Sequence, residues 1–380
     1  MRIGIIGLGH RMAHLAQAFA KAEPAAEFVA VADPHADRMG VLKALGSAPA
    51  RHHDAAEMIA AHRLDMLMIG SPNHLHLEHL RAAMASDVPH VFAEKPLVVS
   101  EEETLELARL IAERDGRARL MVGLVLRYSP LYRMLRAAQA DGHLGEIMSI
   151  EACEHIAPYH GSFFARDWRR DSALSGGFML EKCCHDIDLY QGVVGARAMR
   201  VASFGGAKKW TPAEKPASAP AYLSAMAPRW GGTDDAWSGT GDIVDHQVAL
   251  VEYDGGATMA FHANTNVPDE YRRFAVIGTE GMAEGDFIRN HFRVTLSDTG
   301  ERMVDVPALD LGSDDGHYGA DGAMARDVME HVRSGAPLPL SALDAMEAGV
   351  TALAMDRARR EGRVVDLTEF WERYDEALSG

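Results

Sequence analysis

The sequence contains few cysteines and no block of basic residues. Its three cysteines, Cys153, Cys183 and Cys184, make no disulfide framework, and we expect free thiols in a reducing compartment. The formal net charge is -17 at pH 7. A partner with a phosphate backbone requires a basic face, so the composition argues against nucleic acid.

Long apolar runs are missing as well. No stretch reaches the about 18 apolar residues of a membrane helix, and the apolar run at the N-terminus stops at Gly7 without the pattern of a cleavable signal. We therefore expect no membrane partner and a cytoplasmic location. The hydrophobic content of 47% is that of a globular protein, and 380 residues suggest two domains that share a cleft.

The first fourteen residues predict a dinucleotide site. A buried strand over residues 3–6 runs into a glycine turn and then a helix from near His10. Gly7 allows the tight turn, and Gly9 lets the backbone approach a pyrophosphate without a Cβ in the way. A second strand over 27–32 leads to Asp33, at the spacing where an acidic side chain accepts hydrogen bonds from the adenosine ribose.

This fingerprint is incomplete, because Met12 occupies the third glycine position, where a small residue normally allows close packing of helix on strand. A glycine pair can also be an ordinary turn, so the alternative of no nucleotide site stays open. Asp33 predicts NAD rather than NADP, since its carboxylate would repel a 2'-phosphate and no arginine follows it immediately.

The order of the expected elements predicts an α/β protein of two domains. Residues 1–122 alternate strands with helices, which indicates a Rossmann domain with a doubly wound parallel sheet. Residues 123–380 predict an α+β substrate and oligomerisation domain with a large, mostly antiparallel sheet, because several strands are separated by short turns. We expect an irregular insertion at 205–241 that can overhang the cleft, and a helix at 341–360 that can return to the first domain.

Glu94-Lys95-Pro96 is the first candidate for chemistry. It follows an expected parallel strand, and ligands bind at the carboxyl ends of such strands. A lysine is most often a solvated surface charge, but an apolar strand delivers Lys95 directly to the expected cofactor edge. The position favours a functional interpretation.

The second candidate is an expected helix that begins at Gly176-Gly177 and ends at Gly195. Glu181, His185 and Asp188 fall on one face at i, i+4 and i+7. The imidazole of His185 suits proton removal from a hydroxyl near neutral pH, and a carboxylate can fix its tautomer. The alternative is an exposed face of ion pairs. Another face is expected in the core, with Leu180, Cys184, Ile187 and Val194.

Together these motifs resemble the glucose-fructose oxidoreductase and inositol dehydrogenase (Gfo/Idh/MocA) family over essentially the whole chain. The matching stretches are Gly7-x-Gly9 with Asp33, Ser71-Pro72-Asn73-His74-x-His76, Glu94-Lys95-Pro96, Arg127-Tyr128-x-Pro130, Gly142-x-x-Gly145, Gly176-Gly177 with His185-x-x-Asp188, and Ile277-Gly278-Thr279-Glu280-Gly281. The resemblance implies a Rossmann domain and an α/β domain whose open sheet often forms the oligomer contact. It also implies a lysine-proline bond that is often cis.

The resemblance further assigns Lys95 and His185 to the hydroxyl that is oxidised, next to the nicotinamide, on sugars or cyclitols. The family usually has an aspartate four residues before the histidine, where this chain has Glu181, followed by Lys182. The expected site has three catalytic residues, Lys95, His185 and Glu181. The expected cofactor-binding residues are Gly7, Gly9, His10, Arg11, Met12, Asp33, Ser71, Asn73, His76, Glu94 and Lys95. The expected substrate-binding residues are Arg127, Tyr128, Trp168, Arg169, Lys182, Asp188 and His317.

No metal is expected. The imidazoles of His74, His76 and His79 are dense, but a zinc site requires ligands that converge and are held by further partners. The sequence thus predicts an NAD-dependent dehydrogenase of a sugar, cyclitol or related polyol, working as a homodimer or homotetramer. Two alternatives stay open: an NAD-dependent glycosidase that oxidises its sugar transiently, and a non-catalytic nucleotide-binding sensor.

Overall fold

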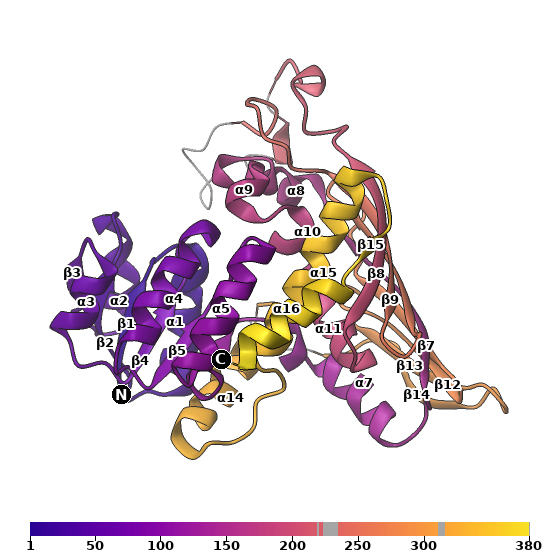
Figure 1. Ribbon diagram of the computed structural model, residues 1–380, viewed down its shortest axis with the longest axis horizontal. Coiled ribbons are helices and arrows are strands. Elements are labelled where there is room, and N and C mark those ends of the chain that lie inside the picture. Colours follow the sequence, from indigo (N-terminus) through magenta and orange to yellow (C-terminus); the bar gives the residue numbers. More distant parts are fainter. Residues whose placement is uncertain (219, 223–234, 311–315, 380) are drawn as a thin grey trace. The chain divides into compact units, whose positions relative to one another are not determined.

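The computed structural model describes residues 1–218, 220–222, 235–310 and 316–379 of the chain. It divides into two compact units (Figure 1). The first comprises Met1–Tyr128, Asp314–Met346 and Phe370–Gly380, and the second comprises Ser129–Ser313 and Glu347–Glu369. Each unit is built on its own sheet.

The first unit contains a six-stranded sheet in the order β3-β2-β1-β4-β5-β6, with every neighbouring pair parallel. Its strands are β1 (Arg2–Ile6), β2 (Glu27–Ala32), β3 (Ala50–His52), β4 (Met66–Ile69), β5 (His90–Ala93) and β6 (Leu120–Val122). Strands buried on both faces read as nearly continuous apolar runs, as in Met66–Ile69, where all four residues are buried. This is the expected doubly wound fold.

Helices fall into two groups around this sheet. Contacts join α3, α4 and α5 in one group, and α1, α2 and α14 in the other. The helical segments of the unit are α1 (His10–Ala22), η1 (Ala36–Met39), α2 (Gly40–Ala44), α3 (Ala55–Ala61), η2 (Asn73–Leu75), α4 (His76–Ala85), α5 (Glu101–Glu113), α6 (Gly116–Arg119), η3 (Val125–Tyr128), α14 (Ala320–Ser334) and α16 (Thr368–Ser379). Helix α15 (Ala342–Glu361) begins in this unit and continues in the second.

The glycine turn after β1 has the geometry that its sequence requires. Gly7 has a φ of 80°, and a Cβ there would lie 2.6 Å from the backbone nitrogen of Ser71, so no other residue fits. Met12 fits at the third glycine position because Gly70 faces it, where an added Cβ would lie 2.6 Å from the Met12 Cε. In the usual motif a small residue on the helix leaves room for the neighbouring strand. Here the small residue is Gly70, directly after β4, and the larger Met12 is on the helix.

The second unit contains a nine-stranded sheet in the order β14-β13-β12-β11-β7-β10-β9-β8-β15. Its strands are β7 (Ile147–His155), β8 (Ala198–Gly206), β9 (His246–Tyr253), β10 (Thr258–Asn264), β11 (Arg273–Gly278), β12 (Gly281–Asp286), β13 (His291–Leu296), β14 (Arg302–Val306) and β15 (Val365–Asp366). Only β7 and β10 pair in parallel among these described strands, and the other pairs are antiparallel. The expected mostly antiparallel sheet is confirmed.

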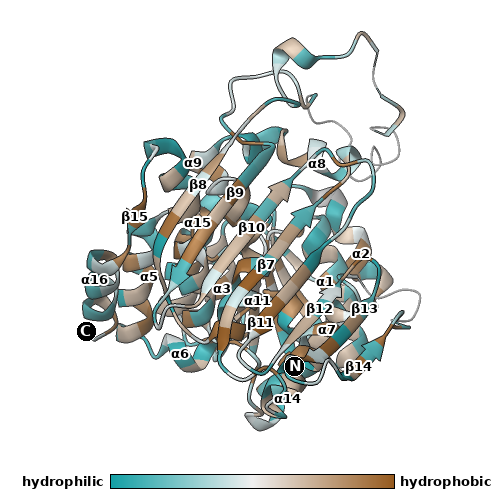
Figure 2. Cartoon of the chain, turned by 90° about the vertical axis from the view of Figure 1, so that its right-hand side faces the viewer, coloured by the Kyte–Doolittle hydropathy of each residue, from teal (hydrophilic) through white to brown (hydrophobic). Residues whose placement is uncertain are grey.

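One face of this sheet is buried and the other is open. Residues along β9 alternate between buried and more exposed positions, as one covered face requires. Figure 2 views the sheet from this side and colours its strands by hydropathy, with hydrophobic residues among hydrophilic ones. The large exposed apolar residues on the strands of this sheet are Met148, Phe204, Val248, Leu250, Ile277 and Met303.

The helical segments of the second unit lie between and after its strands. They are α7 (Pro130–Ala140), α8 (Pro158–Phe164), η4 (Asp167–Arg170), α9 (Ser172–Ser175), α10 (Phe178–Glu181), α11 (Cys184–Val194) and η5 (Pro212–Glu214). Part of the expected insertion at 205–241, including Trp230, lies outside the described residues. Near its ends Trp210 and Trp237 are buried and their rings are 5.4 Å apart.

The division into units differs from the expected boundary after residue 122. The first unit continues to Tyr128, and segments 314–346 and 370–380, which we expected in the second domain, belong to it as well. The physical reason is that α14 contacts α1 and η3, with Ala323, Met324 and Val328 buried. Within the described residues, no helix is long and apolar enough to cross a membrane.

Candidate active site

The carboxyl ends of three neighbouring strands bring the sequence motifs of the first unit together. Ile6 pairs with Ile69, and Ile69 pairs with Ala93, so the loops that begin at Gly7, Gly70 and Glu94 leave the sheet side by side. A Cβ added to Gly9 would meet no atom within 4 Å. This open backbone, at the N-terminus of α1, fits the pyrophosphate of a dinucleotide.

Asp33 lies just after β2 at the same edge and is only 2% exposed. Its carboxylate accepts hydrogen bonds from the backbone nitrogens of Leu8 and His35, both at 2.7 Å. It also accepts one from Arg38 Nη1 at 3.2 Å. The first two bonds hold the acid against the glycine turn, whereas the ion pair with Arg38 was not expected from the sequence.

Arg11 links the glycine turn to two distant segments. Its Nε donates to Glu94 Oε1 at 3.1 Å, and its other two nitrogens donate to both oxygens of Asp321 at 2.9 and 2.7 Å. His14 and His317 lie 3.1 and 3.0 Å from the same Asp321 carboxylate. Arg11, expected at the cofactor, thus also fixes Glu94, the residue before Lys95.

Asp321 carries the strongest charge interactions of this cluster. Burial acts to raise its pKa, but His317, His14 and Arg11 outweigh burial and hold the pKa well below its usual range. Sequence analysis missed this residue, because a single aspartate in a helix carries no pattern that reveals a partner 310 positions away.

The loop after β4 supplies Ser71, Asn73 and His76. Asn73 and His76 are buried, and His76 begins α4. The ring of His76 lies between two backbone carbonyls, with Nδ1 2.6 Å from Pro96 O and Nε2 2.8 Å from Ser71 O. Lys95 itself is half-buried, and its peptide bond to Pro96 is cis, as the resemblance implied.

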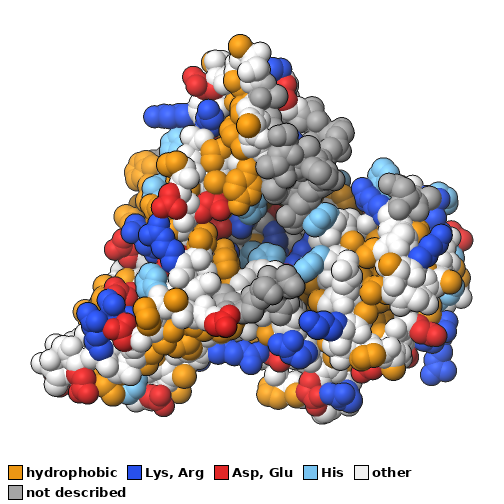
Figure 3. Space-filling model, turned by 180° about the vertical axis from the view of Figure 1, so that it is seen from behind, with side chains coloured by type: hydrophobic (Ala, Val, Ile, Leu, Met, Phe, Trp, Pro, Cys, Tyr) orange, Lys and Arg blue, Asp and Glu red, His pale blue; other side chains and the backbone are white. Residues whose placement is uncertain are grey.

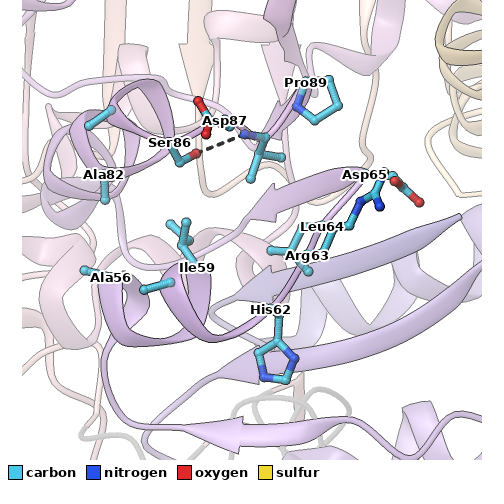
Figure 4. Close-up of a pocket in the computed structure, with 13 residues that line it drawn as sticks. Ala56, Ile59, His62, Arg63, Leu64, Asp65, Ala82, Ser86, Asp87 and Pro89 are labelled. Carbon is cyan, nitrogen blue, oxygen red and sulfur yellow. Dashed lines mark hydrogen bonds between the residues drawn. The ribbon is translucent and has the colours of Figure 1, made fainter.

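The pocket of Figure 4 lies elsewhere in the first unit. Its volume is about 770 Å³, and Leu64, Asp65, Val88 and Pro89 line it just before β4 and β5 begin. Cofactors bind at the carboxyl ends of parallel strands, which are the opposite ends. We therefore assign no part of the expected site to this pocket.

In the second unit, the helix expected from Gly177 to Gly195 is broken. α10 ends at Glu181 and α11 begins at Cys184, with a turn at Lys182 and Cys183, although the backbone nitrogen of Lys182 still donates to Phe178 O at 3.0 Å. The expected placement of Glu181, His185 and Asp188 on one continuous helix is therefore wrong. All three side chains are nonetheless buried, which also contradicts the alternative of an exposed ion-pair face.

A cluster of buried charges accompanies the break. Lys182 Nζ lies 2.8 Å from Glu154 Oε1, and Arg272 Nε lies 2.6 Å from Glu154 Oε2. Arg272 also donates to both oxygens of Asp186 at 2.7 and 2.6 Å. These contacts fix the start of α11, and with it His185, to the central strand β7.

Asp186 is fully buried within this cluster. Burial raises its pKa, and the carboxylate of Glu154 adds to that effect while Arg272 opposes it. The two cations that face Asp186 and Glu154, Arg272 and Lys182, offset the cost of burying these carboxylates. Sequence analysis missed Glu154, Asp186 and Arg272, since alternating charged residues in a strand or helix normally mark a solvated face.

Trp168 and Arg169, two expected substrate residues, form a compact group on η4. The guanidinium of Arg169 lies 4.2 Å from the centre of the Trp168 ring and 4.0 Å from that of Phe163. Its Nε donates to Glu181 Oε1 at 3.2 Å. Glu181 therefore holds Arg169 beside two aromatic rings.

The remaining expected substrate residues divide between the units. Arg127 and Tyr128 are buried in η3 of the first unit, where Arg127 Nη1 donates to Pro339 O at 3.3 Å. His317 belongs to the first unit too, with a φ of 52°, and Asp188 to the second. Lys95 and His185 likewise come from different units.

The charges on the described surface are mixed. Figure 3 shows Lys and Arg side chains interspersed with Asp and Glu on the face that it displays. Among the described residues, no group of three or more His, Cys, Asp or Glu side chains could hold a metal ion.

Comparison with known proteins agrees with this architecture. A model described as oxidoreductase family, NAD-binding Rossmann fold, matches residues 1–124, and one described as oxidoreductase family, C-terminal alpha/beta domain, matches residues 138–367. Fold and site thus define an NAD-binding oxidoreductase with a Rossmann unit and an α/β unit. The chain belongs to the Gfo/Idh/MocA family.

The curated relatives have low sequence identity to this chain, but they align over most of its length. Myo-inositol 2-dehydrogenase of Thermotoga maritima is 24% identical and covers 97% of this chain and 99% of the relative. The 2,7-anhydro-N-acetylneuraminate hydratase of Escherichia coli is 24% identical over 74% of this chain and 67% of its own. The family therefore contains more than one reaction.

Solved structures share the fold. Levoglucosan dehydrogenase in complex with NADH and levoglucosan has a TM-score of 0.77 at 19% identity, covering 97% of this chain and 99% of that one. Scyllo-inositol dehydrogenase of Lactobacillus casei with NAD(H) and scyllo-inositol has a TM-score of 0.71 at 21% identity, with the same coverage. At these identities the likeness concerns the fold alone.

Proposed function

We propose that this chain is an NAD-dependent dehydrogenase of a sugar, cyclitol or related polyol, with Lys95 and His185 at the reacting hydroxyl. The observation that carries the proposal is the position of Lys95. It follows β5 directly, at the edge where the glycine turn fits a dinucleotide, and Glu94 beside it is tied to Arg11 in that turn. A surface lysine has no need of such an anchored neighbour.

The chemistry requires one base and one cation at the carbinol. NAD, when bound, supplies the acceptor for the hydride. His185 would take the hydroxyl proton, and the ammonium of Lys95 would stabilise the developing alkoxide. The buried contacts of Asp186 with Arg272 support the assignment of His185, because they hold the start of α11 in a fixed position.

Substrate recognition is proposed for the remaining site residues. Trp168 and Arg169 offer a ring and a guanidinium, and Lys182 offers an ammonium held by Glu154. Aromatic faces and fixed donors are the groups that recognise a polyol. The names of two relatives, an inositol dehydrogenase over nearly the whole length and a levoglucosan dehydrogenase of the same fold, support this substrate class.

A second candidate is cofactor-assisted cleavage of a glycosidic bond through transient oxidation. The relative named 2,7-anhydro-N-acetylneuraminate hydratase favours keeping it, because its name describes no net oxidation. A non-catalytic nucleotide-binding sensor gives no reason for Lys95 and His185 to be present together.

We also propose that two or four copies of the chain assemble through the open face of the nine-stranded sheet. Phe204 is 71% exposed and Leu250 57% exposed on the neighbouring strands β8 and β9. Large apolar side chains gathered on one face mark a protein interface more often than a solvated surface.

The experiment that tests the proposed activity is a substrate panel. Inositols, free sugars and anhydrosugars are each incubated with NAD, and NADH is followed by absorbance while product mass is measured in parallel. We expect NADH formation with at least one polyol and a product lighter by two hydrogens. Failure of every polyol, together with cleavage of a glycoside, would favour the second candidate.

A further inference from the structure

We propose that His76 is a doubly protonated positioning residue, whose imidazolium ties the loop after β4 to the loop that carries Lys95. The inference starts from the two partners of its ring. Nδ1 lies 2.6 Å from Pro96 O, and Nε2 lies 2.8 Å from Ser71 O. The residue is 1% exposed, so water does not compete for either contact.

The chemistry of the partners decides the protonation. A neutral imidazole carries one N–H and one lone pair, whereas a backbone carbonyl only accepts. With a neutral ring, one carbonyl oxygen would face a lone pair at hydrogen-bond distance. The imidazolium donates to both carbonyls, and charge-assisted bonds are short, as the 2.6 Å contact is.

The neighbouring titratable groups bear on the same charge. On its own segment these are His74, Glu78 and His79, and on the Pro96 loop they are Glu94 and Lys95. Burial lowers the pKa of His79, and His76 lowers it further, so His79 is the neutral member of the two. Its Nδ1 lies 2.8 Å from the hydroxyl of Ser71, which can donate or accept.

The location of the ring gives the contact its role. Ser71 stands against Gly7, where a Cβ would lie 2.6 Å from the Ser71 nitrogen, so its carbonyl belongs to the layer that supports the glycine turn. Pro96 directly follows Lys95. The imidazolium therefore sets the distance between the cofactor turn and the lysine, and loss of its proton releases one of the two loops.

The kinetic part of this inference rests on the proposed function, whereas the protonation state does not. The first measurement is therefore nitrogen NMR of the full-length protein labelled with ¹⁵N-histidine at pH 7.5. We expect both ring nitrogens of His76 to resonate as protonated imidazolium, with His79 as an internal neutral control. Signals are assigned by their loss in His76→Gln. One N–H and one bare nitrogen on His76 would overturn the proposal.

The second measurement is the pH profile of kcat with the polyol found in the panel. Glutamine can replace only the Nε2 contact and asparagine only the Nδ1 contact. We expect His76→Gln to lower kcat by roughly 10- to 100-fold, as misplacement of a catalytic group does, and His76→Asn to lose less, because it keeps a donor toward Pro96. NAD affinity should change by less than about threefold in both.

Wild-type kcat should fall with rising pH where the NMR signal of His76 loses its proton, and this limb should be absent in His76→Gln. His62→Gln, at the opposite end of the sheet, is the activity control. Wild-type kcat and an unchanged profile in both His76 variants would refute the positioning role. If the variants do not fold, the ring signals of His76 are assigned by through-bond correlation to its own backbone in uniformly labelled wild type, and that measurement still decides the protonation.

Discussion

Arg11 and Asp321 form a two-bond ion pair, at 2.9 and 2.7 Å, across 310 positions of sequence. The pair joins the first turn of α1 to the first turn of α14. It helps to explain why segment 314–346 belongs to the nucleotide-binding unit, because Arg11 and His14 of α1 contact the buried carboxylate of α14. Asp321 therefore stabilises the glycine turn by holding Arg11, although it lies outside every recognised motif.

We expect Asp321→Asn to destabilise the protein by about 3 kcal/mol, since it removes one of the two carboxylates that pair with Arg11. The pKa of Asp321 is lowered in the folded state, so its stabilisation is present above the usual pKa of about 4 and is lost as the pH falls. Thermal unfolding at pH 7 and at about pH 2.5 measures both effects, because the unfolded chain takes up this proton only below its usual pKa, and the variant should differ less from wild type at the lower pH. Glu330→Gln, in an exposed ion pair of the same helix, is the control and should cost little.

We predict that the choice between NAD and NADP depends on Asp33 and Arg38. We expect wild type to bind NAD more tightly than NADP, because a buried carboxylate repels a 2'-phosphate. Asp33→Ser should reduce the difference in affinity between NAD and NADP, because it removes the repulsion. Arg38→Ala should increase this difference, because it removes the cation that lies 3.2 Å from Asp33. Fluorescence titration with both cofactors measures the affinities, with Lys43→Ala as the surface control. A wild-type preference for NADP would end this assignment.

The sequence predicted the nucleotide-binding elements well, because each is specified by residues that are close together in the chain. The expected strand 27–32 has the bounds found in the structure, and the glycine turn is in place. The strand pattern of β12 is weak in the sequence because Gly281 and Gly285 interrupt it, and that of β14 is weak because the strand is short and exposed.

The break at Lys182 could not be predicted either. Helical periodicity registers only the spacing of side chains along the chain, and it continues unchanged through this residue. Lys182 contacts Glu154 on β7, which is distant in the sequence, and the contact is buried. The residues 176–195 alone therefore do not predict it. Contacts of this kind also explain why Arg272 and Asp321 escaped notice.

Loss of either proposed catalytic group should lower kcat strongly. We expect Lys95→Ala and His185→Ala each to reduce kcat by about 100-fold or more, as for a positioned base or electrostatic group. NAD affinity of His185→Ala should stay close to wild type, which separates catalysis from cofactor binding. Near-normal turnover in that variant would return α11 to a purely structural role.

The variant Glu181→Asp tests whether Glu181 orients His185 or contacts the substrate. Glu181 accepts from Arg169, and a shorter carboxylate at this position is the residue that the family usually has. Intact or improved kcat would indicate that the residue orients His185. Complete loss of kcat would indicate that Glu181, or the Arg169 that it holds, contacts the substrate directly.

Assembly should depend on the apolar residues of the open sheet face. We expect Leu250→Lys to convert the oligomer into smaller species, because it places a charge where Phe204 and Val248 are to be covered by a second copy. Light scattering after size exclusion measures the mass, and Glu113→Lys in the first unit serves as the control. A wild-type monomer at micromolar concentration would contradict the proposed interface.

The central claim is net oxidation of a polyol, and the yield of NADH per product tests it most directly. The protein is incubated with its best polyol and excess NAD, and in parallel with aryl glycosides and a trace of NAD. We predict one NADH for each product molecule in the first reaction and no sustained aglycone release in the second. Many turnovers of aglycone release without accumulation of NADH would contradict the dehydrogenase account.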